Sequence, residues 1–147
     1  PCVEEAKSAG VPLMVENAPF HNADIHIAHT LRDTITLAEM AGIGVCIDLF
    51  GCWMEADLKN LIERALPSCN LVQVCDYVLG DRAPAARAVP GDGAIPLERL
   101  LDWILSAGYK GAFDLELFGP RIEKEGRLDA VRRSADRVGE ILVSLGA

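Results

Sequence analysis

The stretch "LVQVCDY" (residues 71–77) reads as a buried β-strand that nevertheless carries two polar side chains. Val72 and Val74 belong to its apolar run, whereas Gln73 interrupts that run and Asp76 closes it. Short, nearly continuous apolar runs are typical of parallel strands that are covered on both faces. The stretch therefore predicts a parallel sheet, and it raises the question of which polar residue has a chemical role.

Three further apolar runs resemble this one, and stretches with helical periodicity separate them. The other runs are "GVPLMVEN" (10–17), "GIGVCIDL" (42–49) and "KGAFDLEL" (110–117). Apolar residues recur at helical spacing over 28–41, 55–66, 97–107 and 128–145, and the opening "PCVEEAKSAG" reads as the end of a helix. Helix followed by four βα units predicts an α/β fold with about four parallel strands, in one domain over 1–147. No strand is followed by GxGxxG or GxxxxGK[ST], which disfavours the nucleotide-binding α/β folds.

The composition of the chain argues against some binding partners and indicates the cellular compartment. The 147 residues are 50% hydrophobic and carry a formal net charge of −8, which argues against nucleic acid or an anionic membrane as the main partner. No apolar run approaches the roughly 18 residues that a membrane-spanning helix requires. Five cysteines without CxxC spacing are expected to be reduced thiols in a cytoplasmic protein.

Each of the four runs carries a polar side chain at or near its C-terminal end. These residues are Glu16, Asp48, either Gln73 or Asp76, and Glu116. In parallel α/β folds the C-terminal ends of the strands are where ligands bind. Strand ends also carry polar helix caps, which is the alternative explanation for any one of them. Their recurrence in all four strands favours a binding site.

Alternation along the strands decides between Gln73 and Asp76. Side chains of a strand point alternately to opposite faces of the sheet. In three strands the bulky apolar residues form one set, suited to a helix-covered face, and the carboxylate belongs to the other set. In 71–76 the bulky set is Val72 and Val74, which places Asp76 outward with them and Gln73 inward. We therefore predict that Gln73 faces the same side as the other strand-end residues.

Three carboxylates and an amide oxygen at one place repel each other unless a cation lies between them. An all-oxygen set suits a hard divalent ion such as Mg²⁺ or Mn²⁺, whereas Zn²⁺ prefers nitrogen or sulfur. The alternative is that these groups are caps and buried hydrogen-bonded side chains. A His-rich metal site is not expected, because the chain has only three histidines, His21, His26 and His29. They could line the mouth of a site, but their stretch also reads as an ordinary loop running into a capped helix.

A long loop over 80–96, rich in Pro and Gly, follows the third strand and carries Arg82 and Arg87. Loops of this length are usually functional or disordered. An arginine there can hold a substrate oxygen, and a solvated surface position is the alternative. Trp53 follows the C-terminal end of the second strand, so it could form part of the wall of a pocket there.

The segments "LMVEN", "GVCIDL", "VQVCDY…RAVPGDG" and "GAFDLELFGP" resemble the C-terminal half of the xylose-isomerase-like TIM barrels of the sugar phosphate isomerase/epimerase family. The resemblance implies one divalent metal, Mn²⁺ or Mg²⁺ first and Co²⁺ or Zn²⁺ as alternatives, held by Glu16, Asp48, Gln73 and Glu116. It also implies that Glu16 and Glu116 transfer a proton next to the carbonyl of a small sugar or hydroxy-ketone through an enediolate. Arg87 matches a substrate contact of the epimerases. The position of their substrate-binding histidine is Gly51 here.

A complete barrel of this kind takes about 250 residues and eight strands. This chain offers four, so we expect either a fragment of a longer protein or a half-barrel that pairs with another copy, and a homo-oligomer in either case. Two other functions stay open: a metallophosphoesterase of the endonuclease IV type, which would bind three zinc ions, and a non-catalytic barrel half that acts as a binding module.

Overall fold

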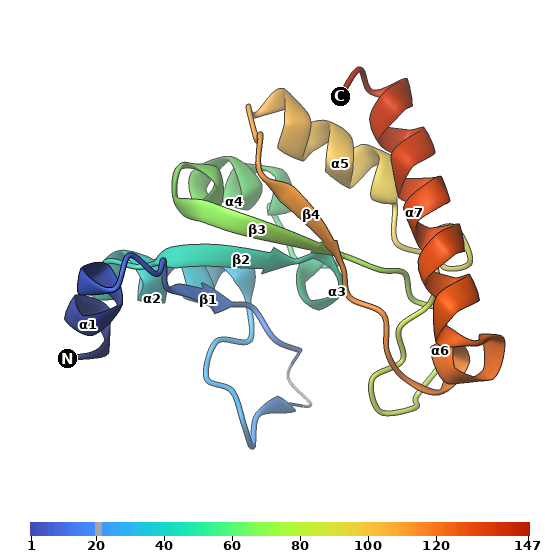
Figure 1. Ribbon diagram of the computed structural model, residues 1–147, viewed down its shortest axis with the longest axis horizontal. Helices are drawn as coiled ribbons and strands as arrows, with labels where there is room; N and C mark the ends of the chain where they lie inside the picture. Colours follow the sequence, from blue (N-terminus) through green and yellow to red (C-terminus); the bar gives the residue numbers. More distant parts are fainter. Residues whose placement is uncertain (20–21) are drawn as a thin grey trace.

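The computed structural model describes residues 1–19 and 22–147. Four strands form its centre: β1 (Met14–Glu16), β2 (Gly44–Asp48), β3 (Cys69–Val74) and β4 (Ala112–Leu115). The helices are α1 (Cys2–Ser8), α2 (Leu31–Ala41), α3 (Leu49–Cys52), α4 (Leu58–Ala65), the 3₁₀ turn η2 (Leu66–Ser68), α5 (Leu97–Ser106), α6 (Pro120–Glu125) and α7 (Arg127–Ser144). The alternation of strands and helices follows the predicted order along the chain (Figure 1).

The four strands form one parallel sheet in the sequential order β1-β2-β3-β4. Asp48 lies opposite Gln73 in the register of β2 and β3, and Gln73 lies opposite Asp114 in the register of β3 and β4. A sheet whose strands neighbour one another in chain order is a section of a barrel wall, which confirms the predicted fold class. The strands are shorter than the apolar runs, since the run ends lead into loops.

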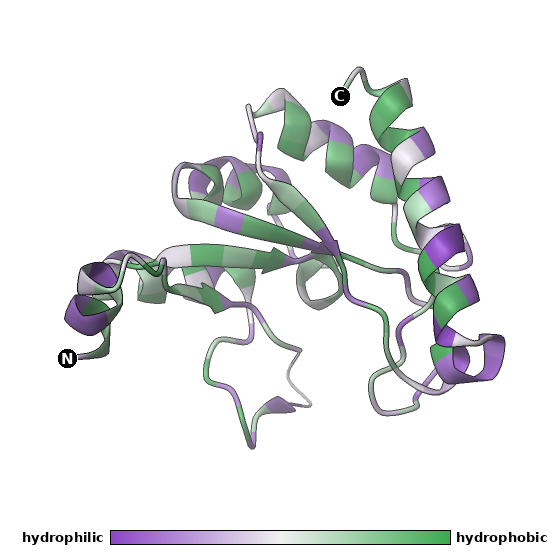
Figure 2. Ribbon diagram, viewed as in Figure 1, coloured by the Kyte–Doolittle hydropathy of each residue, from purple (hydrophilic) through white to green (hydrophobic). Residues whose placement is uncertain are grey.

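The helices cover one face of this sheet and build the main core there. Valine and isoleucine side chains of β2 and β3 meet apolar stripes of α2, α4, α5 and α7; members of this cluster include Leu31, Ile35, Val45, Ile47, Leu61, Ile62, Val72, Val74, Leu100, Leu101, Ile104 and Ile141. Figure 2 shows apolar and polar residues alternating around α4, α5 and α7, as expected for amphipathic helices. Burial of these stripes fixes the sheet beneath the helices.

Two short helices appear where the sequence analysis placed none. Asp48 is the N-cap of the helix α3, and its side chain accepts a hydrogen bond from the backbone N–H of Phe50. The helix α6 begins with Pro120, a residue suited to the first turn. Helices of four and six residues are too short to show a helical period in the sequence. Their position matters because both follow strands that carry site residues.

The structure also bears on the thiols and on membrane insertion. All five cysteines are free, as the sequence analysis expected. Over residues 1–19 and 22–147, no helix combines the length and the apolar character needed to cross a bilayer.

Candidate metal and substrate site

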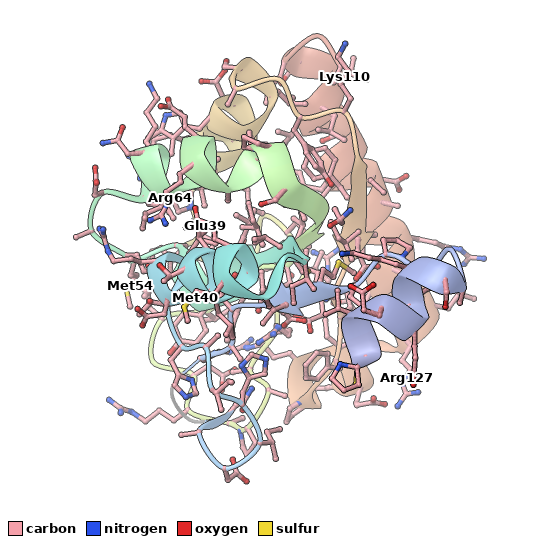
Figure 3. The ribbon with its side chains drawn as sticks, turned by 90° about the vertical axis from the view of Figure 1, so that its left-hand side faces the viewer. Glu39, Met40, Met54, Arg64, Lys110 and Arg127 are labelled. Atoms are coloured by element: carbon pink, nitrogen blue, oxygen red, sulfur yellow. The ribbon has the colours of Figure 1, made fainter. Side chains whose placement is uncertain are left out.

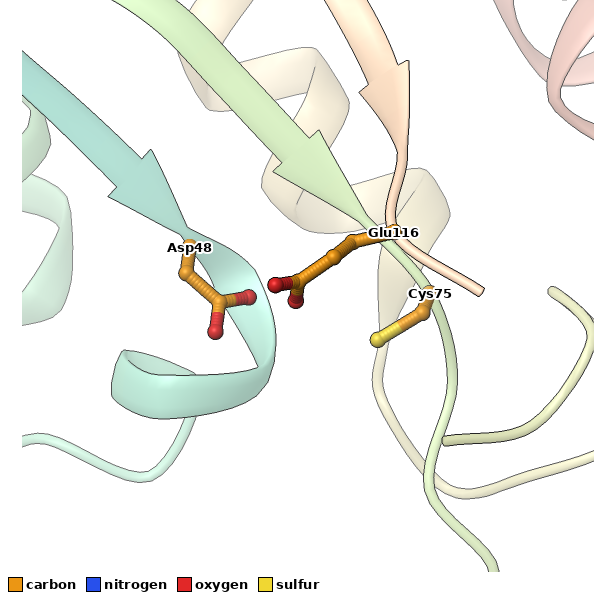
Figure 4. A group of neighbouring side chains, drawn as sticks. All are labelled: Asp48, Cys75 and Glu116. Atoms are coloured by element: carbon orange, nitrogen blue, oxygen red, sulfur yellow. The ribbon is translucent and has the colours of Figure 1, made fainter. Parts of the chain in front are cut away.

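Side chains from three strand ends converge on the face of the sheet opposite to the helices. Ligand atoms of Asp48, Cys75 and Glu116 all lie within 4.8 Å of one another (Figure 4). Asp48 ends β2 and is fully buried, and its Oδ1 accepts a hydrogen bond of 2.9 Å from the N–H of Phe50. Glu116 follows β4, and its backbone N–H donates to the carbonyl of Val74. The convergence places two acidic groups and a thiol at one point.

Arg87 enters this cluster from the loop after β3. Its Nη2 donates to Asp48 Oδ2 at 3.1 Å and to Glu116 Oε2, and its Nε donates to the same glutamate oxygen at 3.0 Å. The guanidinium carbon lies 3.8 Å from the ring centroid of Phe50 and 4.9 Å from that of Phe118. Only 4% of Arg87 is exposed. Of the two arginines singled out in the sequence, this one belongs to the site.

The charges at the site are unbalanced. Burial, and then the negative charge of Glu116, raise the pKa of Glu16 above its usual value. Burial also raises the pKa of Asp48, to about 7, although Arg87 opposes that rise. Were Glu16, Asp48 and Glu116 all ionised, as carboxylate ligands of a metal are, one guanidinium would leave a formal charge of −2. A divalent cation would neutralise this charge, so the residues fit such an ion.

Gln73 faces the site side of the sheet, as alternation along β3 predicts. It lies opposite Asp48 in the strand register, and its Oε1 accepts a weak hydrogen bond of 3.3 Å from the Sγ of Cys46. Glu16 lies opposite Cys46 and so belongs to the same face. Cys75 also faces inward, and its thiol lies beside the carboxylates of Asp48 and Glu116. The role of Gln73 as a metal ligand stays a prediction.

Asp76 holds the long loop instead of entering the site. It is 1% exposed, and its carboxylate accepts hydrogen bonds of 2.9–3.0 Å from the backbone N–H groups of Gly91, Gly93 and Ile95. Its own backbone pairs with Ala88 in an isolated antiparallel bridge. The Asp76 carboxylate therefore serves the loop and not the acidic cluster, in line with the alternation along 71–76. Because Ala88 follows Arg87, this bridge also fixes the backbone that carries the arginine.

Asn17, which was not predicted as a site residue, joins the ends of β1 and β2 by hydrogen bonds. Its fully buried amide donates to the carbonyl of Asp48 at 2.9 Å and accepts from the N–H of Asp48 at 3.0 Å. A Cβ on Gly51 would lie 2.6 Å from the Asn17 amide nitrogen. The close approach of Asn17 therefore requires glycine at the position where the epimerases carry a histidine. The available signal was the position of Asn17, directly after Glu16 at a strand end.

Other predicted site residues lie elsewhere. Arg82 is exposed on the loop, and Trp53 packs against the helix-side core near Leu58 and Trp103. Among the described residues, no hydrogen bond or ion pair joins Arg82 or Trp53 to the carboxylates, so a pocket-wall position for Trp53 finds no support. The ring nitrogens of His26 and His29 contact the backbone of Ala28 and Ala18, as in an ordinary loop. His21 lies outside the described residues.

A comparison with protein families decides how this geometry is classified. The family model described as "Xylose isomerase-like TIM barrel" matches residues 1–140. The chain belongs to this family. Membership in the xylose isomerase-like family agrees with the parallel sheet, its sequential strand order and the position of the site at the strand ends.

Individual relatives are about twice as long as this chain. An inosose isomerase from Halalkalibacterium halodurans is 23% identical over 143 residues, which cover 95% of this chain and 51% of the relative. The structure of a protein from Sinorhizobium meliloti 1021 matches with a TM-score of 0.78 and 26% identity, over 94% of this chain and 53% of that one. The IolI protein, solved with a zinc atom, matches with a TM-score of 0.78 and 18% identity, over 97% and 53%. The chain thus spans about half the length of the relatives it matches.

Proposed function

We propose that this chain supplies the metal-binding and proton-transferring part of a divalent-metal-dependent isomerase or epimerase that acts on small sugars or hydroxy-ketones. The observation that carries the proposal is the convergence of the Asp48 and Glu116 carboxylates at the strand ends, where both share the single guanidinium of Arg87. Family membership and the similarity to an inosose isomerase support the reaction class. The zinc atom bound by the IolI protein supports a divalent metal.

Four inward-facing residues would hold the ion: Glu16, Asp48, Gln73 and Glu116. Mn²⁺ or Mg²⁺ fits this oxygen set best, while Co²⁺ or Zn²⁺ would gain from the nearby thiol of Cys75. When bound, a divalent ion acts as a Lewis acid on the oxygens of a carbonyl substrate. The two hydrogen bonds from Asn17 to the backbone of Asp48 hold that ligand in place.

The two glutamates would move the proton. One carboxylate removes a proton from the carbon next to the carbonyl, which leaves an enediolate, and the other returns a proton to the neighbouring carbon or to the opposite face. Burial raises the pKa of Glu16, which brings this carboxyl closer to the range in which it can both accept and donate a proton near neutral pH. Glu116 lies with Asp48 at the end of β4, and its negative charge contributes to the raised pKa of Glu16.

Arg87 would contact the substrate. Its guanidinium lies at the carboxylates and is enclosed by aromatic rings, so its donors are aimed at the place where the reacting oxygens would lie. Arg82 and Trp53 remain further predicted contacts. They would depend on parts of the pocket wall that the described residues do not form.

Exchange of a carbon-bound proton with solvent tests the reaction class. The purified chain is incubated with Mn²⁺, D₂O and a panel of small ketoses and hydroxy-ketones, and deuterium next to the carbonyl is followed by NMR. We expect incorporation that Glu116→Gln abolishes and that Asp114→Asn, an exposed carboxylate on the same face, preserves. Exchange by Glu116→Gln at the rate of the unaltered chain would contradict the acid–base assignment.

Metal content separates this proposal from the two alternatives. One Mn²⁺ or Mg²⁺ per chain agrees with the isomerase. Several zinc ions per chain would instead favour the metallophosphoesterase. Failure to bind any divalent ion at millimolar concentration would contradict the proposed function and favour the non-catalytic binding module.

A further inference from the structure

We propose that Arg87 and the metal ion compete for the carboxylate oxygens of Asp48 and Glu116, so that metal binding moves the guanidinium off these two side chains. The inference rests on the proposed function and adds a coupling between the metal and the substrate-contacting arginine. Among the described residues, Arg87 carries the one buried guanidinium, and it forms ion pairs with Asp48 and Glu116, two of the four predicted metal ligands.

The arginine is held as a bound cation would be. Two carboxylates receive its Nη2, one of them also receives its Nε, and the rings of Phe50 and Phe118 lie within 5 Å of its guanidinium carbon. Charge-assisted hydrogen bonds in a buried setting are the strongest of their kind in proteins. Without a metal, Arg87 therefore holds together two strand ends whose carboxylates would otherwise repel each other.

A metal ion and Arg87 compete for the same oxygens. Both oxygens of Asp48 are engaged, Oδ1 by the N–H of Phe50 and Oδ2 by Arg87. Both donors of Arg87 that reach Glu116 use its Oε2. An ion that binds Asp48 Oδ2 or Glu116 Oε2 would take that oxygen from the guanidinium, and an ion at either carboxylate would stand close to its positive charge. Each cation therefore weakens the binding of the other.

Only the side chain of Arg87 needs to move. Its backbone N–H donates to the carbonyl of Ala85 at 2.8 Å, and the next residue, Ala88, pairs with Asp76 through two backbone hydrogen bonds of 2.8 Å. The carboxylate of Asp76 anchors the remainder of the loop. A displaced guanidinium on this fixed backbone stays within reach of the site, where it becomes available to a substrate oxygen. Metal loading would thereby prepare the substrate contact.

Calorimetric titration with Mn²⁺ tests the competition. Arg87→Met keeps an apolar stem beside Phe50 and Phe118 but removes the charge. We expect it to bind Mn²⁺ about tenfold tighter than the unaltered chain, since the metal no longer has to displace a guanidinium from the carboxylate oxygens. Arg64→Met is the matched control. Arg64 makes two hydrogen bonds to the carboxylate of Glu39 on the exposed surface (Figure 3), so its removal should leave Mn²⁺ affinity unchanged.

The outcomes separate the inference from the proposed function. Equal or weaker Mn²⁺ binding by Arg87→Met, with normal binding by the unaltered chain, would overturn the competition and leave the metal site standing. Absence of binding by the unaltered chain would overturn both. If Arg87→Met does not fold, the Nε–H resonance of Arg87 in the unaltered chain decides. A shift of that resonance on addition of diamagnetic Zn²⁺ supports displacement, and an unchanged resonance at saturation refutes it.

Discussion

The two faces of the sheet are built from the same strands but have different roles. On the helix-covered face, Val45, Ile47, Val72 and Val74 are each 0% exposed and lie in one apolar core. On the other face, the neighbouring residues along the chain include the polar Asp48 and Gln73, and Gln73 lies between two of the core valines. Because alternate side chains of a strand point in opposite directions, one short segment can stabilise the fold and line a site at once.

Substitutions on the two faces should therefore affect different properties of the protein. Core side chains contribute through apolar area removed from water and through close packing, so truncation there leaves a cavity. Side chains on the site face contribute through charge and hydrogen bonding to few partners, and Asp48, Glu116 and Arg87 account for most of these contacts. Substitutions on the first face should lower stability, and those on the second should alter ligand binding.

The largest expected effect is on the helix-covered face. Ile47→Ala should lower the free energy of unfolding by about 2–5 kcal/mol, since it removes a fully buried side chain from the main core. Gln73→Ala, on the site face of the neighbouring strand, serves as its control and should cost less than about 1 kcal/mol. Urea denaturation measures both. Equal losses would contradict the division of labour between the faces.

A smaller effect is expected at the loop anchor. Asp76→Asn keeps the size of the side chain but replaces one of the carboxylate oxygens that serve the N–H groups of Gly91, Gly93 and Ile95. We expect a loss of about 1–3 kcal/mol, because a buried donor is left without an acceptor. Hydrogen exchange should show faster exchange of these three amides, while the amides of the core strand residues Val72 and Val74 stay protected. Unchanged protection in the loop would show that Asp76 is not its anchor.

Much of this arrangement could be predicted from local patterns. The apolar runs located all four strands, and alternation separated Gln73 from Asp76 because both signals depend on residues close in sequence. The resemblance singled out Arg87 but not its ion pairs with Asp48, 39 residues away, and Glu116, 29 residues away. Asn17 was not predicted because it binds the backbone of Asp48, and contacts with backbone groups leave no pattern in the sequence. The contact of Trp53 with the helix-side core could not be predicted, because it follows the short helix α3, which shows no helical period in the sequence.

The central claim is that the inward-facing strand-end residues form one metal site. Comparing Mn²⁺ affinity for Gln73→Ala and Asp76→Ala tests it most directly, since these residues are three apart but face opposite sides of the sheet. We expect Gln73→Ala to weaken Mn²⁺ binding by at least about tenfold, as loss of a ligand should cost no less than loss of a supporting residue. We expect Asp76→Ala to weaken it less. The reverse order would contradict the account.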